Sequence, residues 1–168
     1  MVDSFHSRVR LSHHQVLISP LDEPLPAHPR AFPNGLIALD DDEPDAGATI
    51  LTGVHTGVVD FTVQLVRQPP PPDLDSWDEI VEISLECAFG TLHVRGLHGD
   101  LPRDLPNLAT EGDGWYRLRV HATGRDTDPG GIARTPTERY LLVVWPAPPQ
   151  PELVLKRSDA YGAEVRAR

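Results

Sequence analysis

Proline is the residue that most restricts what this chain can fold into. Its 18 prolines and 13 glycines are spread over 168 residues. Proline lacks the amide hydrogen that helix interiors and central strands need, so regular elements must be short. This pattern favours an all-β fold, an antiparallel β-sandwich or open barrel with long Pro-rich loops.

Short apolar or alternating runs mark the expected strands. Residues 114–123 alternate most clearly, with Tyr116, Leu118 and Val120 on one face. Residues 140–145 are apolar on both faces, which is typical of a central strand. A turn at Phe89 and Gly90 is predicted to close a hairpin. The other expected strands are 15–19, which would be the first of the chain, 35–39, 57–66, 77–87, 91–95 and a last one beginning near 154.

The length favours one domain, which we place at residues 1–157 with a long Pro-rich and acidic connection at 20–48. Residues 158–168 are polar and predict a frayed C-terminal tail. The first residues lack the apolar core of a signal peptide, and no apolar run is long enough to span a membrane. A single cysteine, Cys87, excludes an intramolecular disulfide. These features predict a cytoplasmic protein.

The charge is acidic and unevenly distributed. The net charge is -10, which argues against direct binding to nucleic acid or to an anionic membrane. Residues 1–86 contain fifteen acidic and four basic residues, so the first half carries all of the net negative charge. If the protein recognises a partner electrostatically, we expect the contact surface in this half.

Two acidic groups are the candidate partner-binding residues. The first follows the apolar run at 35–39 and contains Asp40, Asp41, Asp42, Glu43 and Asp45. The alternative for this group is a solvated loop without a binding role. The second group flanks Trp77, which is a candidate anchor for a partner or else a core residue at the start of a strand. Its acidic members are Asp73, Asp75, Asp78 and Glu79.

The polar face of the 114–123 strand offers a different interpretation. Trp115, Arg117, Arg119 and His121 share this face and could line a pocket for a small molecule or a metal. The same alternation is typical of any half-exposed strand. In that case the acidic residues at 82 and 86 of a neighbouring strand would pair with the arginines. We expect the half-exposed strand and keep the pocket as the alternative.

No residue pattern points to catalysis or to a cofactor, and we expect neither. The eight histidines lack a third ligand at a fixed spacing, because the adjacent His13 and His14 would point to opposite faces of a strand. Cys87 lies in an apolar strand with no base nearby in the sequence. No phosphate-binding or hydrolase motif occurs. A hydrolase whose carboxylates meet only in three dimensions stays open as an alternative.

Three segments together resemble the ComJ-type competence proteins, small acidic inhibitors of a competence-associated nuclease. They are S-H-H-Q-V at 12–16, G-W-Y-R-L-R-V at 114–120 and E-R-Y-L-L-V-V-W at 138–145. The resemblance spans residues 10–145 and fixes no inhibitory residue. It implies an antiparallel β-sandwich that binds and blocks a basic nuclease, as an inhibitor or immunity protein of a bacterium. An acidic surface would suit that role by charge complementarity.

Overall fold

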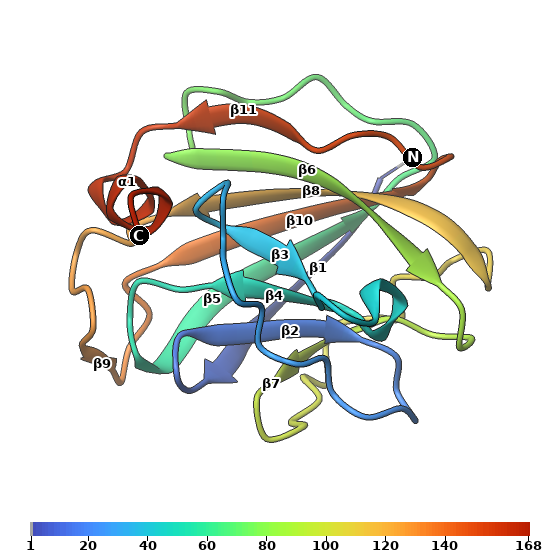
Figure 1. Ribbon diagram of the computed structural model, residues 1–168, viewed down its shortest axis with the longest axis horizontal. Helices are drawn as coiled ribbons and strands as arrows, with labels where there is room; N and C mark the ends of the chain where they lie inside the picture. Colours follow the sequence, from blue (N-terminus) through green and yellow to red (C-terminus); the bar gives the residue numbers. More distant parts are fainter. Residues whose placement is uncertain (1) are drawn as a thin grey trace.

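The computed structural model describes residues 2–168 and contains two β-sheets packed face to face (Figure 1). The larger, sheet A, has seven strands, and the smaller, sheet B, has four. In spatial order, sheet A contains β1 (Asp3–Leu11), β5 (Thr56–Leu65), β10 (Arg139–Pro146), β8 (Gly114–Thr123), β6 (Glu79–Cys87) and β11 (Leu153–Arg157), with β9 (Ile132–Ala133) beside one end of β5. Sheet B contains β3 (Ile37–Leu39), β4 (Ala48–Leu51), β2 (Gln15–Ser19) and β7 (His93–Gly96).

The predicted all-β class is confirmed. Most strand pairs are antiparallel, and β5 pairs in parallel with β10 and β9. The main core lies between the sheets, because alternate residues of each strand point inward. The strand β10 is central, as its apolar composition predicted. Core residues from sheet A include Val59, Phe61, Leu118 and Leu142, and those from sheet B include Val16, Ile18, Ile50 and Val94.

The hairpin predicted at Phe89 and Gly90 is wrong. The strand before this turn, β6, pairs with β8 and β11 in sheet A, whereas β7 pairs with β2 in sheet B. The turn therefore carries the chain from one sheet to the other. Both strands are apolar on their inward faces, so their residue pattern does not reveal which sheet each one joins.

Residues 15–19 are not the first strand, because β1 precedes them. This strand alternates Phe5, Val9 and Leu11 inward against exposed polar residues, and it pairs with β5 over its whole length. A tight turn at His13 and His14 leads into β2. Both histidines have positive φ, 55° and 62°, as a two-residue hairpin turn of type I′ requires.

The C-terminal segment is helical and docked, so the expectation of a frayed tail is wrong. Helix α1 spans Ala160–Arg166, and Asp159 caps it by accepting a hydrogen bond from the Gly162 amide at 2.7 Å. Tyr161 and Val165 lie four residues apart on one helical face and pack in a second apolar cluster with Phe32 and Leu51. Within residues 2–168, no helix is long and apolar enough to cross a membrane.

Arg125 joins these parts from the turn after β8, and its side chain is 0% exposed. It makes two hydrogen bonds to the carboxylate of Asp159, at 2.8 and 3.0 Å. Its Nη1 donates to the carbonyl oxygens of Gly35 and Leu51, and its guanidinium lies over the Tyr161 ring. One side chain therefore connects sheet A, the end of β4, the loop before β3 and the start of α1.

Replacing Arg125 by alanine should lower the free energy of unfolding by about 3–5 kcal/mol, because Asp159 would remain buried without its partner. Urea denaturation followed by far-UV circular dichroism measures this change. Arg134→Ala is the matched control, since Arg134 is exposed and should change stability by less than about 0.5 kcal/mol. Equal stabilities for the two variants would contradict this role for Arg125.

Candidate functional site

The first acidic group surrounds η1, a single 3₁₀ turn at Pro44–Ala46, and its first member is a structural residue. Asp40 is buried and accepts hydrogen bonds from the amides of Ala27, Asp42 and Glu43 at 2.7 to 3.0 Å. Burial by itself raises the pKa of Asp40, but these hydrogen bonds outweigh it and hold the pKa below its ordinary value. Asp40 therefore stays ionised, and its buried carboxylate fixes the shape of the loop.

The rest of this loop borders a groove with an exposed aromatic side chain. Asp42, Glu43 and Asp45 meet Glu86 from the end of β6 and Trp115 from the start of β8. The groove has a volume of about 390 Å³, and Leu39 and Pro44 supply the rest of its lining. Trp115 is 39% exposed, which is unusual for so large an apolar side chain. We call this site the acidic groove.

A second hollow, of about 300 Å³, lies on the other side of the same loop. It shares Asp42 and Glu43 with the acidic groove and adds Glu23 and Phe89, whose side chain is 46% exposed. Arg30 lies 3.6 and 3.7 Å from Asp41 and Asp42. Across residues 2–168, the carboxylates of Glu23, Glu43, Asp45 and Glu86 have no ion-pair partner. This end of the sandwich thus combines uncompensated negative charge with two exposed aromatic rings.

The second acidic group lies at the opposite end of β6 and does not join the groove. Asp73 accepts hydrogen bonds from the amides of Asp75 and Ser76. Asp78 accepts hydrogen bonds from the Thr123 hydroxyl and the Gly124 amide. Glu79 is 0% exposed and lies 2.8 Å from Arg166, so no partner protein can reach it. Asp75 remains exposed.

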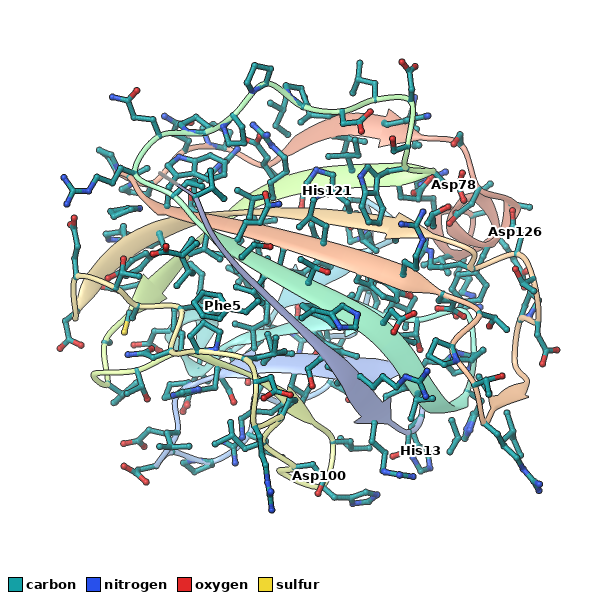
Figure 2. All side chains as sticks on the ribbon, turned by 180° about the vertical axis from the view of Figure 1, so that it is seen from behind. Phe5, His13, Asp78, Asp100, His121 and Asp126 are labelled. Carbon is teal, nitrogen blue, oxygen red and sulfur yellow. The ribbon has the colours of Figure 1, made fainter. Side chains whose placement is uncertain are left out.

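Trp77 is partly buried. Its ring packs against His121 with the centroids 5.4 Å apart, and the Arg139 guanidinium lies 5.1 Å from the ring centre. Figure 2 shows His121 on sheet A with Asp78 near the start of β6. Trp77 therefore covers part of the outer face of sheet A.

The arginines of β8 form a buried charged layer rather than the expected half-exposed face. Arg117 and Arg119 are 2% and 5% exposed, and both donate to Glu82, at 3.2 and 2.8 Å. The predicted pairing with Glu82 is confirmed. Glu86 makes no ion pair in the described chain, because it lies opposite Trp115 in the strand register.

Pro-rich segments cover this charged layer. Arg119 donates to the carbonyl oxygen of Pro70, and Arg117 donates to those of Gln150 and Pro151. Each of these carbonyl oxygens belongs to a proline or to a residue next to one. The sheet is thus charge-paired and closed at this point, which counts against the alternative pocket formed by Trp115, Arg117, Arg119 and His121.

A buried carboxyl group, Glu138, bears on the hydrolase alternative. Glu138 is fully buried and accepts hydrogen bonds from the Tyr140 hydroxyl at 2.5 Å and from the amides of Gly53 and Val54. Burial raises the pKa of Glu138, although these hydrogen bonds act in the opposite direction. Its role is structural, since it is inaccessible. Among residues 2–168, no three His, Cys, Asp or Glu side chains are arranged to hold a metal ion.

Comparison with known proteins identifies the fold. No family model and no curated protein matches the sequence. A solved structure of ComJ from Bacillus subtilis, an inhibitor of the DNA degrading activity of NucA, superposes with a TM-score of 0.61. The chain has the fold of ComJ. The sequences are 14% identical, and the match covers 88% of this chain and 99% of ComJ.

A second solved structure, described as Crocagin biosynthetic gene J, is also similar to this chain. It superposes with a TM-score of 0.54 at 11% identity, again over 88% of this chain and 99% of that one. The expected resemblance to ComJ-type proteins is therefore confirmed at the level of the fold. The acidic groove itself could not be predicted from the sequence, because Trp115 lies about seventy positions after the acidic loop.

The buried His121 predicts a specific response to acid. Burial lowers the pKa of His121 below its ordinary value of 6.5. The positive charge of Arg119 lowers this pKa further, whereas the hydrogen bond to the Leu141 carbonyl offsets part of the decrease. Below pH 6.5 the unfolded chain therefore binds a proton that the folded chain does not, and stability falls as the pH decreases. His121→Gln should reduce the loss of melting temperature between pH 7 and pH 5.

Calorimetry at several pH values measures this effect. His98→Gln is the matched control, because it makes the same replacement at an exposed histidine. An unchanged slope for His121→Gln would show that another group causes the acid sensitivity.

Proposed function

We propose that this protein binds a DNA-degrading nuclease and blocks it through the acidic groove. The observation that carries this proposal is the convergence of four carboxylates on an exposed tryptophan, in a protein with the fold of a nuclease inhibitor. The contact residues are Asp42, Glu43, Asp45, Glu86 and Trp115. The protein would act by occupying a surface of the nuclease and not as an enzyme.

Charge complementarity gives this role its physical basis. A nuclease that grips DNA neutralises phosphates with arginine and lysine side chains, so its DNA-binding cleft is positively charged. A surface with uncompensated carboxylates can occupy such a cleft, and long-range attraction accelerates association at low salt. The same negative charge opposes direct binding of this protein to DNA.

Trp115 supplies the apolar part of the proposed contact. Partly exposed tryptophans often contribute most to the binding energy of an interface, because they bury a large area with little loss of conformational entropy. An indole face also attracts arginine and lysine side chains. Trp115 and its surrounding carboxylates therefore suit a cationic partner surface better than an apolar one.

The remaining candidates have different parts in this proposal. Asp40 stabilises the shape of the loop, and Asp41 forms an ion pair with Arg30. Asp73, Asp75 and Asp78 lie at the other end of β6 and are not included in the contact. We also propose that the protein acts in the cytoplasm of a bacterium. Its one cysteine, Cys87, is buried and free, which suits a reducing compartment.

Neutralising the loop should weaken inhibition. The triple variant Asp42→Asn, Glu43→Gln and Asp45→Asn is expected to raise the concentration needed for half-inhibition about tenfold at low salt, and by less at high salt. The measurement is degradation of linear DNA by the nuclease that the tagged protein retains from its native host. A control variant with the same charge change uses three exposed acids elsewhere: Asp104→Asn, Asp128→Asn and Glu164→Gln.

Trp115→Ala should weaken inhibition by about thirtyfold or more, since removing an anchor of this kind costs at least about 2 kcal/mol. Inhibition by this variant should depend on salt concentration as inhibition by the native protein does, because the substitution removes no charge. The same DNA degradation assay measures this effect. If the loop variant and its charge-matched control inhibit equally, net charge alone explains binding and the acidic groove is not the contact. If the native protein leaves DNA degradation unchanged, the proposed function is wrong.

A further inference from the structure

The two edge strands of sheet A differ in how they are protected against further strand pairing. An exposed edge offers unpaired amides and carbonyls, and proteins usually block it with bulges, prolines, lysines or covering segments. The strand β11 has these features: a bulge between Val154 and Lys156, Pro149 and Pro151 just before it, and a hydrogen bond from Lys156 to the Leu74 carbonyl in a covering segment. This edge is closed.

The other edge, β1, has no bulge, no proline and no lysine. Its nine residues pair with β5 in one unbroken register, from Asp3 opposite Leu65 to Leu11 opposite Gly57, and it contains no proline or glycine. Within residues 2–168, no segment other than β5 makes a backbone hydrogen bond to β1. Gly96 of β7 approaches the carbonyl oxygen of Arg10, so the accessible edge is residues 3–9. It is about 23 Å long.

The surroundings of this edge can receive side chains. A hollow of about 780 Å³ lies at the start of β1, between Asp3 and the segment containing Glu111, and another of about 220 Å³ lies at its end, beside Leu11 and His98. Phe5 points toward the main core but is only half-buried, because no strand lies beyond it (Figure 2). An added strand would cover the free side of its ring.

The charge along β1 indicates what kind of strand fits. His6, Arg8 and Arg10 project from its outer face and are exposed, in a protein that is otherwise acidic. Asp60 is the one carboxylate opposite them on β5, and it lies 3.4 Å from His6. In the described part of the chain, Arg8 and Arg10 have no ion-pair partner. A second copy of β1 would place the same positive charges side by side, so charge favours an acidic strand over self-pairing.

We propose that β1 binds an extended segment of a partner protein by strand addition. Backbone pairing along residues 3–9 supplies the affinity, as in other strand-addition interfaces. Alternate carboxylates of the segment face His6 and Arg8, with Arg10 just beyond the paired residues, and the apolar residues between the carboxylates face Phe5. This surface is separate from the acidic groove, because β5 and β10 lie between β1 and β8.

A fluorescent heptapeptide of alternating glutamate and valine is the probe, and fluorescence polarisation measures its binding to the full chain. Saturable binding is expected, and the double variant Arg8→Glu and Arg10→Glu should lose at least about tenfold in affinity and prefer a heptapeptide of alternating lysine and valine. The matched control is Arg134→Glu with Arg157→Glu, two exposed arginines away from β1. Neutralising Asp42, Glu43 and Asp45 should leave peptide binding unchanged, so this test is independent of nuclease inhibition.

Backbone pairing is tested without altering the protein. Two versions of the acidic heptapeptide carry N-methyl groups on alternate residues, so that each blocks the hydrogen bonds of one edge of the extended peptide. One version should lose binding and the other keep it, since only one edge of the peptide can pair with β1. Equal affinities for the two versions, or no saturable binding of the unmodified peptide, would overturn the proposal.

Discussion

The buried hydrogen bonds of Arg125 hold together parts of the molecule that the sheets alone do not connect. A buried guanidinium is unfavourable unless nearly all of its donors are paired, and here a carboxylate and two carbonyl oxygens satisfy them. The carboxylate, Asp159, also caps α1. If the helix undocked, Arg125 would therefore lose its carboxylate partner. This interaction links sheet A, the end of β4 and the C-terminal helix, at the end of the sandwich away from the acidic groove.

A second consequence of buried pairing is the distribution of charge on the surface. Arg117, Arg119 and Arg125 lie inside the structure and are satisfied there by Glu82, Asp159 and backbone carbonyls. These arginines are therefore unavailable to neutralise the surface of a protein with a net charge of -10. The loop around η1 stays uncompensated except at Arg30, and the proposed nuclease contact depends on that imbalance.

The sequence predicted the strands better than their partners. Alternation in residues 57–66 and 114–123 placed β5 and β8 correctly, because each has one face in the core. The same alternation could not show that the polar face of β8 is covered, since the covering segments contact it through backbone carbonyls that carry no sequence signal. The groove is not apparent from the sequence for a similar reason: the acidic loop and Trp115 are both candidate residues, but only the fold places them together.

The proposed function requires that the nuclease cover the acidic groove. Hydrogen–deuterium exchange of the protein with and without the captured nuclease tests this most directly, because it maps the contact without changing a residue. We predict slower exchange in the segments that form the groove, residues 39–46 and the parts of β6 and β8 around Glu86 and Trp115. Protection confined to other surfaces, with exchange at residues 39–46 unchanged in the complex, would contradict the account.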